Sequence, residues 1–219
     1  MNKIFKIDFD TNRIFGLDIL RALAIMFVVI GHGSYLLPNK LRTISDFFVF
    51  DGVSIFFVLS GFLIGGILIK LIDKNGFNFS ILKTFWIRRW YRTLPNYFLI
   101  LIALCVIHLL FDNDFTLRSV NRYFLFSQNI FREHPSWFFP EAWSLAVEEW
   151  FYLIFPILIF FTFPFKRSYK KSLLYVALIV IFFITAFRFY RFSNVDIDGI
   201  NDWDLIFRKQ VITRLDSLM

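Results

Sequence analysis

The chain has 219 residues, of which 58% are hydrophobic, 21% aromatic and only 19% charged. A soluble domain is about 45–50% apolar and about 25% charged, and a domain of this size could not bury so much apolar surface. The formal charge of +7 would suit nucleic acid, but the basic residues lie between apolar blocks, where membrane topology explains them better. Composition therefore excludes a soluble or disordered chain and argues against a nucleic-acid partner.

Five blocks without Asp, Glu, Lys or Arg indicate membrane helices. They cover residues 22–37, 52–69, 93–111, 150–165 and 172–187. A helix crosses a bilayer in about 20 mostly apolar residues. With flanking residues added, we expect helices near 15–37, 47–72, 93–111, 142–164 and 171–191. The sequence thus predicts an all-α, polytopic membrane helix bundle with about five transmembrane helices, forming a single domain over residues 1–219.

The distribution of basic residues predicts the orientation. An N-terminus inside the cell places 13 basic residues on the cytoplasmic side and 5 outside. We therefore expect a cytoplasmic N-terminus in a multi-pass protein of the inner or plasma membrane. Val120–Phe131 is apolar but short, and we interpret it as an interfacial or re-entrant element of an external segment. Leu205–Met219 resembles the beginning of a further helix.

Ionisable groups stand inside the first predicted helix. Asp18, Arg21 and His32 fall within about 60° of one helix face, and such groups normally mark a function because the bilayer makes them costly. Gly31 and Gly33 flank His32, and a histidine can exchange a proton near neutral pH. The alternative is an interfacial Asp18–Arg21 pair, with His32 as an interhelical hydrogen-bond donor.

The second helix carries Ser60, followed by Gly61 and Gly65 at a spacing that favours close helix packing. A serine in this position could be a nucleophile, although membrane serines more often bond their own helix. The single Cys105 lies in an apolar block, which excludes a disulfide framework and a cysteine metal site. No motif for zinc or phosphate-loop binding is present, and we predict no metal site.

A basic and aromatic run precedes the third apolar block. Arg88, Arg89 and Arg92 are close on one turn of a helix, and guanidinium groups bind phosphates well. The alternative is a basic cluster that only stops membrane transfer.

Ser144, Glu148 and Tyr152 recur every four residues at the start of the fourth predicted helix, beside Trp143. The carboxylate could orient an imidazole or bind sugar hydroxyls, or it could be an exposed interfacial group. We expect a structural role for His108 and a solvated loop position for His134.

Taken in order, these segments resemble the acyltransferase-3 family of integral-membrane acyltransferases. The matching motifs are Arg21 and His32 separated by ten residues, Ser54 to Ile64, Arg89-x-x-Arg92 with Pro95, Trp143-Ser144-Leu145-x-x-Glu148-x-x-Phe151-Tyr152, and Arg214-Leu215-Asp216.

The resemblance implies transfer of an acyl group, usually acetyl, from cytoplasmic acyl-coenzyme A to a hydroxyl of a cell-surface or membrane-linked carbohydrate. It ties His32 and Arg21 to activity. We expect His32 to act as the general base or, alternatively, to carry the acyl group. Further assignments are coenzyme A phosphate binding by Arg21, Arg88, Arg89 and Arg92, positioning by Glu148, and substrate contacts by Asp18, Ser60, Trp143 and Ser144. Acyl-coenzyme A is then a co-substrate, with no tightly bound cofactor.

Family members have about ten membrane helices, so the resemblance implies that these five are the N-terminal half of an enzyme. The expected partners are membrane lipid, the two substrates, and either the other half or a second copy of the chain. Two alternatives remain: an inactive fragment, and a small transporter or proton pathway. A transporter would predict broken helices and repeated halves, and neither is visible in the sequence.

Overall fold

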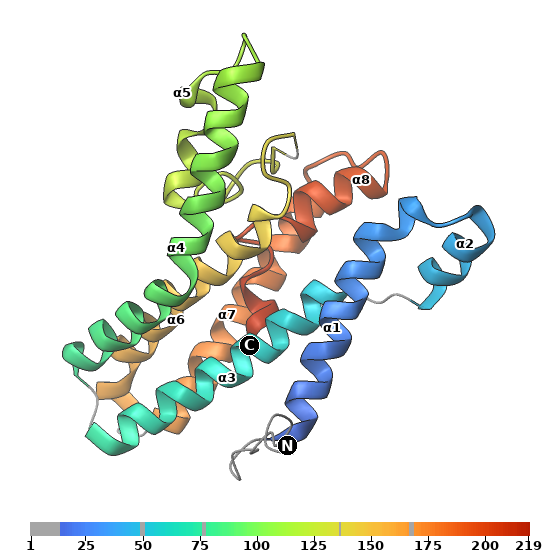
Figure 1. Cartoon of the computed structure of the whole chain (residues 1–219). Helices are drawn as coiled ribbons and strands as arrows, with labels where there is room; N and C mark the ends of the chain where they lie inside the picture. Colours follow the sequence, from blue (N-terminus) through green and yellow to red (C-terminus); the bar gives the residue numbers. More distant parts are fainter. Residues whose placement is uncertain (1–13, 49–50, 76–77, 136, 167–168) are drawn as a thin grey trace, which may run out of the picture. The chain divides into compact units, whose positions relative to one another are not determined.

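The computed structural model describes residues 14–48, 51–75, 78–135, 137–166 and 169–219, and in these ranges every regular element is helical. The elements, shown in Figure 1, are α1 (Phe15–Gly33), η1 (Ser34–Leu36), α2 (Asn39–Phe48), α3 (Gly52–Asn75), α4 (Phe79–Phe111), α5 (Leu117–Val120), η2 (Asn121–Leu125), α6 (Ala142–Lys166), α7 (Tyr169–Phe192), α8 (Ile200–Trp203), the π-helical turn η3 (Asp204–Arg208) and η4 (Leu215–Leu218).

Within the described residues, five helices are long and apolar enough to cross a membrane: Phe15–Gly33, Gly52–Asp73, Phe79–Phe111, Ala142–Thr162 and Lys171–Phe192. They expose large apolar side chains such as Phe182 and Phe183 of α7, which suit a lipid environment. The prediction of an all-α membrane protein with five spanning helices is confirmed.

The described residues form two compact units, one ending at Ser60 and one covering Gly61–Met219. In the first unit, the start of α3 packs closely on α1. A Cβ atom at Gly52 would lie 2.5 Å from the carbonyl oxygen of Ala24, which is fully buried. Asp51 caps α3, because its carboxylate accepts hydrogen bonds from the backbone N–H and the hydroxyl of Ser54, at 3.3 and 2.7 Å.

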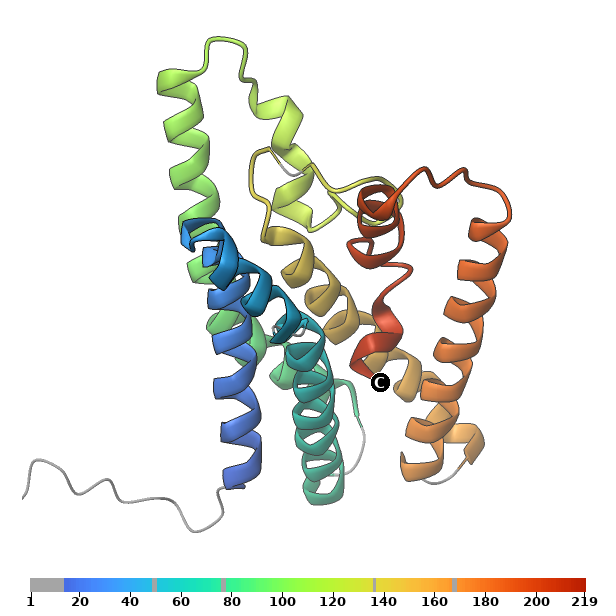
Figure 2. The same cartoon turned by 90° about the vertical axis from the view of Figure 1, so that its right-hand side faces the viewer.

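The second unit contains α4, α6 and α7. Figure 1 shows that α4 changes direction along its length, and Pro95 inside the helix accounts for a bend because it removes a backbone hydrogen bond. η4 lies against both α6 and α7, as Figure 2 shows.

The prediction that Leu205–Met219 is the beginning of a helix is wrong, because the segment forms short turns that are largely buried. Ile206, Phe207, Val211 and Leu218 are each less than 10% exposed. Arg188 of α7 holds the segment, since its guanidinium donates to the carbonyl of Thr213 at 2.8 Å and pairs with Asp216 at 2.6 Å. The apolar side chains here are spaced for tertiary packing rather than for one helix face.

The segment between α4 and α6 folds over the end of α4 as short turns and loops. Its core contains Tyr97, Val120, Tyr123 and Phe138, all buried. As expected, Val120–Phe131 does not form a spanning helix: it contains only η2 and a left-handed residue, Phe126.

Three predicted helix boundaries differ from the structure. The helix predicted over 15–37 ends at Gly33. The range predicted as one helix over 47–72 includes the end of α2 as well as most of α3. The third helix begins at Phe79 instead of 93, where the side chain of Asn78 caps it by accepting from the N–H of Ile81 at 3.1 Å. The start of this helix was predicted after the charged run 83–92. Charged residues do not end a helix, however, where the helix continues outside the apolar layer of the membrane.

Candidate active site

Two of the three ionisable groups on α1 form an ion pair. Arg21 contacts Asp18 at 3.2 Å, one turn away, and both side chains are partly exposed. His32 lies in the last turn of α1 and is exposed. Helical rise places it about 16 Å from Arg21 along the axis of α1, so the two side chains lie at different levels of this helix.

The surroundings of His32 are open within the described part of its unit. A Cβ atom at Gly33 would meet no described atom within 4 Å. Ser60, at the end of the same unit, is half-buried on α3.

In the second unit, Arg89 of α4 and Glu148 of α6 are brought together. The Arg89 guanidinium lies 3.4 Å from the Glu148 carboxylate and 4.2 Å above the ring centroid of Tyr152. The Tyr152 hydroxyl donates to the same carboxylate at 2.8 Å, and Arg89 also contacts this hydroxyl. Arg89 and Glu148 are both less than one-fifth exposed. This polar cluster joins the charged first part of α4 to the beginning of α6.

A second polar contact lies beside this pair, and it was not predicted from the sequence. The hydroxyl of Thr93 donates to Glu149 at 2.8 Å, and Glu149 is only 6% exposed. Trp86 donates its indole N–H to the carbonyl of Tyr152 at 2.9 Å, which joins α4 to α6 nearby. The Glu148-Glu149 doublet in an otherwise apolar segment was the available signal for Glu149.

The other arginines of the motif differ from Arg89. Arg88 and Arg92 are exposed on α4, and neither forms an ion pair with a described residue. At the start of α6, Trp143 is buried beneath the guanidinium of Arg208, 5.2 Å from the ring centroid. The hydroxyl of Ser144 donates to the carbonyl of Glu141 at 3.1 Å.

Of the predictions for the two remaining histidines, one agrees with the structure and the other is wrong. His108 stacks on Phe115 with ring centroids 5.1 Å apart, in agreement with the expected structural role. The expectation that His134 is solvated is wrong: it is 3% exposed, and its Nε2 lies 3.1 Å from the carbonyl oxygen of Phe139. Burial lowers its pKa from 6.5 to about 4. The polar sequence around it gave no sign of the aromatic cluster that covers it.

Five apolar helices with paired ionisable groups between them define a multi-pass membrane protein that carries polar sites within its membrane segments. The chain belongs to a family of membrane acyltransferases, because residues 14–207 match the sequence profile of the Acyltransferase domain. This match covers the Arg21–His32 face, Ser60, Arg88 to Arg92 and Glu148.

Similar proteins carry O-acetyltransferase names. A Staphylococcus aureus (strain COL) protein provisionally named O-acetyltransferase SACOL0978 is 34% identical over 173 residues, which are 73% of this chain and 27% of that protein. The Bacillus subtilis (strain 168) protein provisionally named peptidoglycan O-acetyltransferase YrhL is 32% identical over 179 residues, 76% of this chain and 27% of that protein. Peptidoglycan O-acetyltransferase OatA of Listeria monocytogenes is 34% identical over 153 residues, 64% of this chain and 23% of that protein.

The chain therefore spans about a quarter of the length of these relatives. No solved structure matches it.

Proposed function

We propose that the protein is a membrane O-acyltransferase that moves an acetyl group from acetyl-coenzyme A to a hydroxyl of a cell-surface or membrane-linked carbohydrate. The family match over residues 14–207 carries this proposal. Two of the relatives named above are peptidoglycan O-acetyltransferases by name, which favours acetyl as the group and a cell-wall glycan as the acceptor.

His32 supplies the proton chemistry that this reaction needs. The acceptor hydroxyl oxygen attacks the thioester carbonyl carbon, the carbon–sulfur bond breaks, and the thiolate of coenzyme A leaves. His32 takes the hydroxyl proton and returns it to the departing sulfur, so the reaction consumes no net proton. A positioned histidine contributes about 10²–10⁴-fold to such a step. In the alternative route, a ring nitrogen of His32 accepts the acetyl group first and passes it to the hydroxyl.

The arginines divide between two roles. Arg88 and Arg92 are exposed on α4 and contact the phosphates of the donor. Arg89 is already engaged by Glu148 and Tyr152, so it acts as a positioning residue for that carboxylate. Glu148 in turn accepts a hydrogen bond from an acceptor hydroxyl. Asp18 orients Arg21 through their ion pair.

The test compares two histidines on apolar helices. Membranes containing the protein, or its His32→Gln or His108→Gln variant, are supplied with labelled acetyl-coenzyme A and a cell-wall glycan. We expect at least a 100-fold loss of transfer for His32→Gln, since the base is gone. His108→Gln should stay within about twofold, because His108 packs on aromatic rings and its Nδ1 lies 3.6 Å from Asp112 at the C-cap of the same helix, away from the motif residues.

The amount of each variant in the membrane separates catalytic loss from failed insertion. Transfer by His32→Gln above a tenth of the wild-type rate would remove His32 as the base. Transport of a solute by the wild-type protein without any acetylation would favour the transporter alternative.

A further inference from the structure

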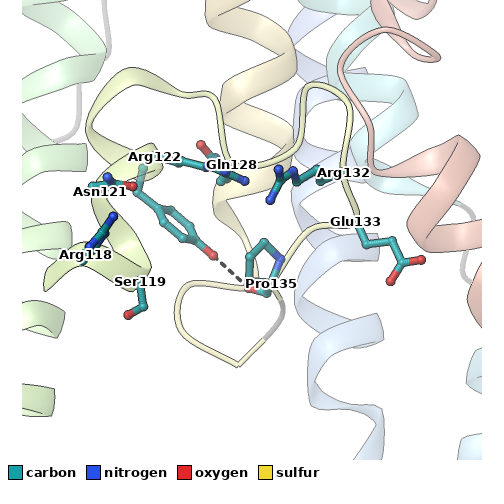
Figure 3. Close-up of a pocket in the computed structure, with 9 residues that line it drawn as sticks. Arg118, Ser119, Asn121, Arg122, Gln128, Arg132, Glu133 and Pro135 are labelled. Atoms are coloured by element: carbon teal, nitrogen blue, oxygen red, sulfur yellow. Dashed lines mark hydrogen bonds between the residues drawn. The ribbon is translucent and has the colours of Figure 1, made fainter. Parts of the chain in front are cut away.

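The segment between α4 and α6 contains a pocket that lies away from the motif residues. Its volume is about 560 Å³, within the range of about 300–1,000 Å³ that small-molecule sites occupy. Figure 3 shows the pocket between η2 and the loop that follows it. Three of its lining residues are arginines: Arg118, Arg122 and Arg132.

These three are all the basic residues of the segment 112–141. The basic-residue distribution predicts that this segment lies outside the cell, where arginine is generally depleted. That all three arginines converge on one pocket is therefore a feature that membrane topology does not explain. None of them forms an ion pair with a described residue.

The acidic side chain of the pocket does not neutralise this charge. Glu133 lines the rim, but Figure 3 shows its carboxylate directed away from Gln128, whereas Arg132 extends toward Gln128. Glu133 interacts electrostatically with Arg191 of α7 instead. The pocket thus presents an excess of positive charge with forked donors, a combination that suits carboxylate or phosphate oxygens.

A buried polar side chain also lines the pocket. Gln128 is 2% exposed and lines the pocket, and its side-chain N–H donates to the carbonyl of Ala142 at 3.2 Å. This bond fixes the amide orientation and leaves Oε1 as an acceptor with no partner in the described protein. Gln128 thus adds a polar wall beside the arginines, which suits a hydroxyl-bearing ligand better than an apolar one.

The pocket walls are held in place by the fold. The Tyr123 hydroxyl donates to the carbonyl of Pro135 at 2.8 Å, and Tyr97 of α4 donates to the carbonyl of Tyr123 at 2.8 Å. Trp150 of α6 donates to the carbonyl of Phe126 at 2.9 Å. These bonds tie the loop to two membrane helices, so the arginines project from a fixed frame.

We propose that this pocket binds an acidic saccharide, a sugar unit that carries a carboxylate or phosphate, and thereby selects the carbohydrate acceptor. The arginines bind the acidic group, and the polar wall at Gln128 suits the neighbouring hydroxyls. This inference rests on the proposed function and on the predicted orientation of the segment. A lipid phosphate would also satisfy the arginines, and nanodiscs with and without anionic lipid distinguish this source from the sugar.

The experiment measures binding to the protein in nanodiscs of neutral phosphatidylcholine. The probes are a glucuronate-containing oligosaccharide, a phosphate-bearing oligosaccharide and a neutral oligosaccharide of equal length. The test variant replaces Arg118, Arg122 and Arg132 with Gln. The matched control is Lys40→Gln, which removes a basic residue from the other segment predicted to be external, 38–46.

We expect the wild-type protein to prefer at least one acidic probe over the neutral one by at least tenfold, with weaker binding at high salt. The triple variant should lose this preference, and Lys40→Gln should keep it. The probe that loses affinity identifies carboxylate or phosphate as the recognised group. Equal binding of acidic and neutral probes, or an unchanged preference in the triple variant, would overturn the proposal. Displacement of the sugar by nanodiscs that contain anionic lipid would assign the pocket to a headgroup instead.

Failure of this inference is distinguishable from failure of the proposed function. His32→Gln should abolish transfer while leaving the binding preference intact, and the arginine triple variant should raise KM for an acidic acceptor without lowering kcat. Binding without any acetyl transfer by the wild-type protein would leave the pocket standing and contradict the acyltransferase. Transfer with an unchanged KM in the triple variant would contradict only the pocket.

Discussion

Gly61 of α3 lies directly against the backbone of Leu218. A Cβ atom at Gly61 would be 1.6 Å from the carbonyl oxygen of Leu218 and 2.6 Å from its carbonyl carbon, so only glycine fits there. The spacing of Gly61 and Gly65 indicated helix packing, but the partner at Gly61 is the terminal turn η4. No described atom lies within 4 Å of a Cβ at Gly65.

These two glycines predict opposite responses to alanine. Gly61→Ala should displace η4 and lower the free energy of unfolding by about 1–3 kcal/mol, the usual cost of overpacking. Gly65→Ala should leave it unchanged or raise it slightly, since alanine favours a helix. Thermal unfolding of the two variants in the same detergent checks the prediction. Equal unfolding temperatures would show that η4 does not press on α3.

The Arg89–Glu148 pair should show energetic coupling. Each single change, Arg89→Gln or Glu148→Gln, leaves a partly buried charge without its partner, whereas the double variant removes both charges. A double-mutant cycle on unfolding should therefore give a coupling energy on the order of 1 kcal/mol. Arg88→Gln combined with Glu148→Gln is the matched cycle, because Arg88 is an exposed neighbour. It should give additive effects, and similar coupling in both cycles would argue against a specific pair.

The buried His134 predicts acid sensitivity of the segment between α4 and α6. Its folded pKa of about 4 lies below the ordinary 6.5, so the unfolded chain binds the proton more tightly. The stabilisation by neutral His134 is therefore complete above pH 6.5 and is lost as the pH falls toward 4. Between pH 6.5 and 4.5 the loss is on the order of 2 kcal/mol.

His134→Gln provides the control, because glutamine can donate to Phe139 but does not titrate. The unfolding temperature of the wild-type protein should fall more steeply with acid than that of His134→Gln. Parallel curves for the two proteins would show that His134 titrates normally.

Helix type and number could be predicted from the sequence because each apolar block is long enough to span a bilayer. The start of α4 could not, since its first 14 residues carry several charges and begin at the cap formed by Asn78. The apolar residues of Leu205–Met219 were visible, but their burial depends on α6 and α7, which no local pattern specifies.

The candidate site also combines contacts that the sequence predicts with contacts that depend on tertiary packing. Asp18 and Arg21 are one turn apart, so their pairing follows from helical spacing. Arg89 and Glu148 stand 59 residues apart, and only the packing of α4 on α6 brings them together. The arginines of the pocket lie on three separate short elements, and their convergence depends on how the loop folds. Motif order along the chain indicated the family, but not these contacts.

The final prediction concerns the orientation on which the pocket proposal depends. The imbalance of basic residues predicts that 70–92 and 166–171 are cytoplasmic and 112–141 is external. Single cysteines at Thr84, Lys171 and Ser119, all exposed positions, report on these three segments once the buried Cys105 is replaced by serine. A membrane-impermeant maleimide added to intact cells should label only the cysteine at 119, and the other two should react after lysis. Labelling at 84 and 171 in intact cells, with protection at 119, would reverse the topology. It would then place the arginine pocket on the cytoplasmic side, where no cell-surface saccharide reaches it.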